Sequence, residues 1–145
     1  MSIPQSVKLP VWFWIIAGIA LMWNLMGVAS YFIQVTMSTE AITALPDVER
    51  ALYDNTPVWA TASFAIAVFS GVAGCILLLL RKRLAIFAFG LSLISITLQM
   101  SYWLLMTNSI EIYGPGGATM PILVIVVGGF LLWFSMSSKA KGWLR

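Results

Sequence analysis

The chain has 145 residues, of which 61% are hydrophobic and only 9% are charged. An ordinary soluble domain is about 45–50% apolar and about 25% charged, and a soluble domain of this length could not bury so much apolar surface. The composition therefore excludes a soluble enzyme, a disordered tail and a disulfide-stapled domain, and it indicates a membrane protein.

The residue inventory narrows the chemistry further. The sequence has no histidine, which is the usual base near neutral pH and a common ligand of haem, zinc and copper. The one cysteine, Cys75, lies in an apolar run and is interpreted as a small buried apolar residue. We therefore expect no enzyme activity, catalytic residue, metal site or cofactor. The net charge of +3 does not indicate nucleic-acid binding, because the basic residues lie at the ends of apolar runs, where lipid headgroups are the expected partners.

The charged residues leave four long uncharged stretches, each longer than the roughly 20 residues that cross a bilayer. Prolines at 10, 57 and 121 mark expected helix starts. These signals predict four membrane-spanning helices, over 11–37, 57–80, 84–108 and 118–138. The predicted fold class is an all-α membrane protein, with a single four-helix transmembrane bundle over residues 1–145.

The charges are segregated between the two ends of the predicted helices. Seven of the eight basic residues fall at one end: Lys8, Arg81, Lys82, Arg83, Lys139, Lys141 and Arg145. All five acids fall at the other end, with Arg50 as the only base there: Glu40, Asp47, Glu49, Asp54 and Glu111. Because cytoplasmic loops carry the excess of Lys and Arg, both termini and the 81–83 turn are predicted to be cytoplasmic.

Aromatic residues mark both ends of the spans, as interfacial belts do. At the acidic end these residues are Tyr53, Trp59, Trp103 and Tyr113. Trp23 departs from this pattern, since it lies near the middle of the first span beside Asn24.

The two loops at the acidic end differ in length. The Gly-Pro-Gly-Gly run over 114–117 predicts a tight turn. In the longer loop, over 38–56, apolar residues recur at helical spacing, and Pro46 is expected to split the segment into two short helices. The second is predicted to be amphipathic, with Asp47 and Glu49 in its first turn. This loop is either a lid over an outward-facing cavity or, the interpretation we favour, a connector resting on the headgroups.

The predicted spans contain no ionisable carboxylate or amine, which argues against proton or sodium coupling. Small residues recur along the second span and allow close helix approach: Ala60, Ser63, Ala67, Ser70 and Gly74. Neutral polar residues share one face of the first span and one face of the third. From these faces we select the candidate lining of a solute or lipid pocket: Asn24, Tyr31, Gln34, Ser95, Gln99 and Tyr102. The alternative is that these side chains only join helices, with hydrogen bonds worth about 0.6 kcal/mol each.

Three runs carry a family resemblance: Trp23-Asn24-Leu25-Met26-Gly27, residues 44–50, and Tyr113-Gly114-Pro115-Gly116-Gly117. Together they resemble a group of small, uncharacterised bacterial four-helix inner-membrane proteins, some of which are labelled sugar transporters. The resemblance implies a location in the bacterial inner membrane and an uncharged polyol as substrate.

Two functions remain open. The first is binding or transport of a small uncharged, sugar-like solute or a lipid, with the lipid bilayer as surroundings and a homodimer to enclose enough volume. The second is a non-catalytic accessory or scaffold subunit, which would bind another membrane protein through the small face of the 57–80 helix or through the acidic loop.

Overall fold

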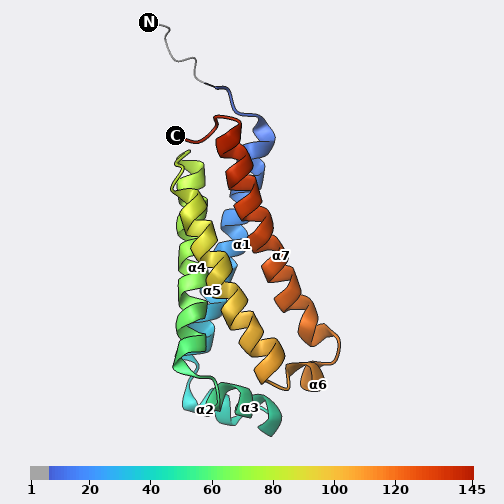
Figure 1. Cartoon of the computed structure of the whole chain (residues 1–145). Helices are drawn as coiled ribbons and strands as arrows, with labels where there is room; N and C mark the ends of the chain where they lie inside the picture. Colours follow the sequence, from blue (N-terminus) through green and yellow to red (C-terminus); the bar gives the residue numbers. More distant parts are fainter. Residues whose placement is uncertain (1–6) are drawn as a thin grey trace, which may run out of the picture.

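The computed structural model describes residues 7–145, and they form an all-helical bundle (Figure 1). The four long helices are α1 (Val11–Thr36), α4 (Val58–Leu79), α5 (Ala85–Ser101) and α7 (Gly116–Ala140). A π-helical turn, η1 (Tyr102–Met106), extends α5. With η1 counted as part of α5, all four are long and apolar enough to cross a membrane. The prediction of an all-α chain with four such helices is confirmed.

The helix bounds agree with the predicted ones to within two residues, but two details near the start of α7 were wrong. Gly116 and Gly117 belong to the first turn of α7 rather than to a loop, and Pro121 lies inside the helix. Gly114, with φ of 69°, allows the chain to reverse before them. Gly117 instead serves packing, because a Cβ there would lie 2.7 Å from the backbone oxygen of Ser109.

Three short helices lie at the end opposite the start of α1 and the end of α7 (Figure 1). They are α2 (Thr39–Thr43), α3 (Asp47–Asp54) and α6 (Ser109–Tyr113). As predicted, Pro46 separates α2 from α3, and Asp47 and Glu49 lie in the first turn of α3. Helix α6 was not predicted, since the sequence indicated only a tight turn between the third and fourth spans. We call this the acidic end of the bundle, and the end that carries Lys8, the 81–83 turn and Arg145 the basic end.

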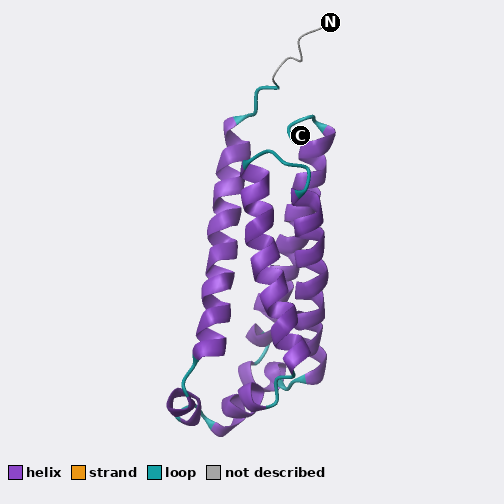
Figure 2. Cartoon of the chain, turned by 90° about the vertical axis from the view of Figure 1, so that its left-hand side faces the viewer, coloured by secondary structure: helices purple, strands orange, loops and turns teal. Residues whose placement is uncertain are grey.

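Helix α4 is the centre of the bundle, in contact with α1 on one side and α5 on the other, while α7 packs on α5 (Figure 2). The small residues of α4 make these contacts. Ala60, Ala67 and Gly74 are buried, and a Cβ at Gly74 would lie 2.8 Å from the Phe89 ring. Most of this small face is therefore covered within the chain, whereas Ser63 and Ser70 are half-buried.

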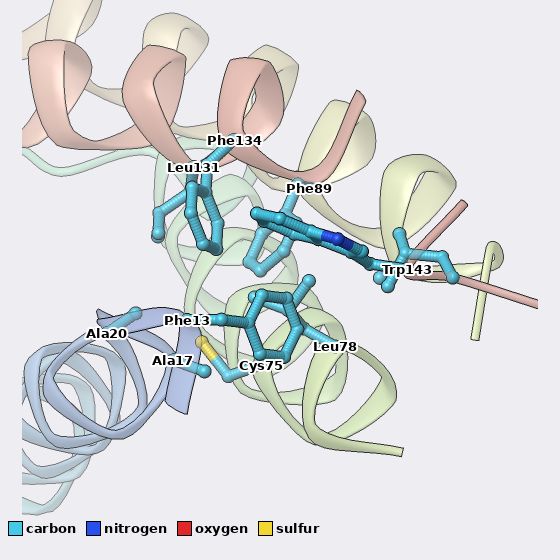
Figure 3. Packing of buried hydrophobic residues seen from close by; sticks show 11 residues of the cluster. Phe13, Ala17, Ala20, Cys75, Leu78, Phe89, Leu131, Phe134 and Trp143 are labelled. Atoms are coloured by element: carbon cyan, nitrogen blue, oxygen red, sulfur yellow. The ribbon is translucent and has the colours of Figure 1, made fainter. Parts of the chain in front are cut away.

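Helices α1 and α7 have no extensive contact, and the aromatic contacts between them lie at the basic end. There the buried Phe13 ring lies 5.7 Å from the Phe134 ring and 5.7 Å from the Trp143 ring. Figure 3 shows these rings converging with Cys75 and Leu78 of α4. Because α1 and α7 are joined at one end only, the space between them toward the acidic end is left open to other occupants.

Candidate functional site

We describe two hollows that lie among residues 7–145. The larger, which we call the central cavity, has a volume of about 250 Å³ between the four long helices. Its lining comprises Trp23, Asn24, Met26, Gly27, Ser30, Phe64, Ala67, Val68, Phe89, Ser92, Ile96, Met100, Met120, Val124, Val127, Gly128 and Leu131. The smaller, which we call the loop pocket, has a volume of about 110 Å³. It is lined by Gln34, Leu52, Tyr53, Thr56, Gln99, Tyr102, Trp103 and Tyr113.

The central cavity is apolar and opens sideways. Apart from Asn24, Ser30 and Ser92, its walls consist of apolar residues and glycines. Met26 of α1 is 62% exposed and Met120 of α7 is 56% exposed, although both line the cavity. The opening therefore lies between α1 and α7. If these helices span a membrane, this opening faces the lipid rather than water.

Asn24 supplies the main polar feature of the central cavity. Its Nδ2 donates to the Ala20 carbonyl at 2.8 Å, within α1, and to Cys75 Sγ at 3.4 Å, across to α4. Both bonds use the amide nitrogen, and the remaining Oδ1 lies against Gly71 of α4. Interhelical bonds of this kind stabilise membrane bundles modestly.

Ser92 lies opposite, on α5, where its hydroxyl donates to the Ala67 carbonyl of α4 at 2.7 Å. Both Asn24 and Ser92 reach the surface of Gly71: a Cβ built there would lie 2.1 Å from Asn24 Oδ1 and 3.3 Å from Ser92 Oγ. The absence of a side chain at Gly71 thus allows one polar group from each flanking helix to reach the same part of α4.

The loop pocket lies at the acidic end and is built from five elements. Gln34 comes from α1, Gln99 from α5, Tyr102 from η1, Tyr53 from α3 and Tyr113 from α6. Thus α3 forms one wall of the pocket. The Tyr102 hydroxyl donates to the Asn55 carbonyl at 3.2 Å, which ties η1 to the segment after α3.

The Glu49 carboxylate lies close enough to the loop pocket to act on Tyr113 in its wall. Burial raises the pKa of Tyr113, and the nearby Glu49 carboxylate raises it further. Both effects favour the neutral phenol over the phenolate. Arg50, the only base at this end, directs its Nη2 to the Thr43 carbonyl at 2.7 Å and lies 3.4 Å from an Asp47 oxygen.

The six candidate residues do not lie together in the structure. Asn24 lines the central cavity, whereas Gln34, Gln99 and Tyr102 line the loop pocket.

The other two line neither hollow. The Tyr31 ring packs at 5.7 Å from Phe64 and 5.8 Å from Phe69, and Ser95 is 6% exposed. Neither of the two hollows described above therefore brings all six candidate residues together.

Most residues that line the two hollows were not predicted from the sequence. The apolar lining of the central cavity carries no signal that separates it from lipid-facing residues, apart from Trp23 near mid-span. Tyr53, Trp103 and Tyr113 were assigned to the interfacial belt, and the same residues line the loop pocket.

In comparisons with known proteins, no family model, no curated protein and no solved structure matches this chain.

Proposed function

We propose that this chain is a multi-pass protein of the bacterial inner membrane that binds a lipid-like ligand in its central cavity. The segregation of basic and acidic residues supports an orientation with both termini in the cytoplasm, and the resemblance noted above supports the bacterial membrane. The observation that carries the ligand class is the apolar cavity that opens between α1 and α7.

The lining favours a hydrocarbon chain over a sugar. A polyol presents many hydroxyls, and each one left unpaired in an apolar site is costly. Of the three polar side chains in the lining, Ser30 donates to the Met26 carbonyl and Ser92 to the Ala67 carbonyl, so both hydroxyl protons are already used. The amide nitrogen of Asn24 is likewise bonded within the protein, so the lining offers few free polar groups and suits a largely apolar ligand.

The size and flexibility of the cavity agree with this assignment. Its 250 Å³ falls just below the roughly 300–1,000 Å³ of sites for drug-sized molecules, which suits one chain or a compact apolar molecule. Met26, Met100 and Met120 line it, and methionine side chains adapt readily to irregular apolar ligands.

An accessory or scaffold role through α4 has less support, because three of the five residues of its small face are buried in a helix that packs on α1 and α5. Such a role would have to use the acidic loops.

Native mass spectrometry of the full chain, purified in a mild non-ionic detergent, tests lipid binding. We expect a lipid to remain on the protein after detergent exchange. Val124→Phe, which fills the cavity, should remove it. Val126→Phe adds the same ring two residues away on α7, where Val126 is 61% exposed and outside the lining, and should leave the lipid bound.

Circular dichroism of both variants establishes that the helices are intact. Equal lipid retention by the two variants, or no retained lipid on the unchanged chain, would overturn the proposed function.

A further inference from the structure

Gln99 holds a buried acceptor that the protein leaves unused. The residue is 9% exposed, it lines the loop pocket, and its Oε1 is fully buried without a hydrogen-bond partner among the described residues. Buried acceptors in folded proteins are nearly always paired, so an exception calls for a ligand, an ion or water. The ligand that completes Gln99 must donate a hydrogen bond.

Aromatic rings form much of the wall around this acceptor. The Trp103 and Tyr113 rings are stacked, with centroids 6.3 Å apart and planes 18° apart. The Tyr102 ring lies edge-on to Trp59 at 5.4 Å. Aromatic faces carry negative potential and attract cations, organic ammonium ions in particular.

Most charged residues at this end of the bundle are acidic, and acidic residues also favour a cation. All five acids of the chain lie at this end, and the Glu49 carboxylate is close enough to Tyr113 to affect its ionisation. Arg50, the only base here, is committed to the Thr43 and Leu45 carbonyls and to Asp47. No charged side chain of either sign from the described part of the chain lines the pocket, so the nearby acids would act on a bound group through its wall.

We propose that the loop pocket binds a small organic ammonium ion, which donates an N–H to Gln99 Oε1 and lies against the Trp103 and Tyr113 rings. A neutral alcohol supplies the donor but gains nothing from the acids or the ring faces. The 110 Å³ volume admits a group the size of an alkylammonium. The site shares no lining residue with the central cavity, so it does not depend on the lipid ligand proposed there.

The experiment follows the unfolding midpoint of the full chain in non-ionic detergent, since a ligand that binds only the folded state raises it. Ethylammonium chloride is titrated against sodium chloride at equal ionic strength, against ethanol as the neutral donor, and against tetramethylammonium as the cation without an N–H. We expect a saturable rise with ethylammonium, a weaker one with tetramethylammonium, and none with sodium or ethanol.

Gln99→Met removes the acceptor at nearly constant volume and should raise the half-saturating ethylammonium concentration about tenfold or more. Glu49→Gln should raise it by a smaller factor. Thr97→Val changes an exposed residue two positions away on α5 and should leave it unchanged. Circular dichroism confirms that each variant is folded.

The ammonium could come from a free amine or from an ethanolamine lipid headgroup. In nanodiscs of phosphatidylcholine, adding phosphatidylethanolamine should weaken ethylammonium binding if the headgroup occupies the pocket, and should not if the ligand is a free amine. Either result supports an ammonium site. The proposal is overturned if ethylammonium gives no saturable shift, if ethanol or sodium matches it, or if folded Gln99→Met binds as the unchanged chain does.

Discussion

Asn24 Oδ1 occupies the space where a side chain at Gly71 would begin, 2.1 Å from the position of a Cβ there. Helix α1 can therefore place an amide against α4 only because residue 71 has no side chain. The same placement brings Asn24 Nδ2 to 3.4 Å from Cys75 Sγ. The contact between α1 and α4 near the central cavity depends on this pair.

Gly71→Ala should destabilise the protein although alanine is the better helix former. The new methyl would displace the Asn24 amide, and overpacking of this kind costs about 1–3 kcal/mol. Reversible unfolding in mixed micelles, followed by circular dichroism, measures the change. Gly90→Ala is the matched control, because a Cβ there meets nothing within 4 Å. Adding Asn24→Ala to Gly71→Ala should restore part of the loss, and a double variant weaker than Gly71→Ala alone would contradict the clash.

Phe13→Ala should loosen the basic end of the bundle. Phe13 is 0% exposed and joins α1 to Phe134 and Trp143, while the single cysteine of the chain, Cys75, is also 0% exposed in the same cluster. Loss of the ring leaves a cavity that destabilises the closed bundle, so N-ethylmaleimide should modify Cys75 faster. Ile15→Ala, at a residue 55% exposed, is the control and should not change the rate. Equal rates in the two variants would show that Phe13 does not hold this end closed.

The long helices were predictable because membrane-crossing length and lack of charge are local properties of the sequence. The place of each polar residue was not. Whether Asn24 faces a cavity depends on how far α7 diverges from α1, and that depends on the packing of α7 on α5 and on the contact of Phe13 with Phe134 at the basic end. The division of the polar faces between two hollows therefore arises from packing between distant segments.

The end of the third span also depends on a contact with a distant segment, which the sequence does not reveal. The π turn η1 places Tyr102 so that its hydroxyl reaches Asn55, 47 residues earlier in the chain. No local pattern in 84–108 reports that partner. Likewise, an interfacial belt and an aromatic pocket wall draw on the same residue types, so the sequence alone could not separate these roles for Trp103 and Tyr113.

Tyr102→Phe removes the hydroxyl that donates to the Asn55 carbonyl at 3.2 Å and keeps the ring beside Trp59. We expect a loss of about 0.5–1.5 kcal/mol, the usual net value of one hydrogen bond. Faster amide hydrogen exchange over residues 53–56 should accompany it, because this segment loses its hydrogen bond to η1. Tyr31→Phe, which alters a half-buried aromatic contact residue, should leave exchange in that segment unchanged. Unchanged exchange in Tyr102→Phe would contradict the tie.

At Arg81, in the turn after α4, backbone strain opposes the stabilising effect of a side-chain hydrogen bond. Its φ of 59° lies in the left-handed region, which costs a non-glycine residue about 1–2 kcal/mol, while its Nε donates to the Trp143 carbonyl at 2.9 Å. Arg81→Ala keeps the strain and loses the bond. Arg81→Gly loses the bond but relieves the strain, and the gain in stability is offset in part by the greater freedom of glycine in the unfolded chain.

We therefore expect Arg81→Gly to be about 0.5–1 kcal/mol more stable than Arg81→Ala, measured by unfolding in mixed micelles. Lys82→Ala, at an exposed neighbour, should stay close to the unchanged chain. If the alanine variant equals or exceeds the glycine variant, then relief of left-handed strain does not contribute to the stability of this turn.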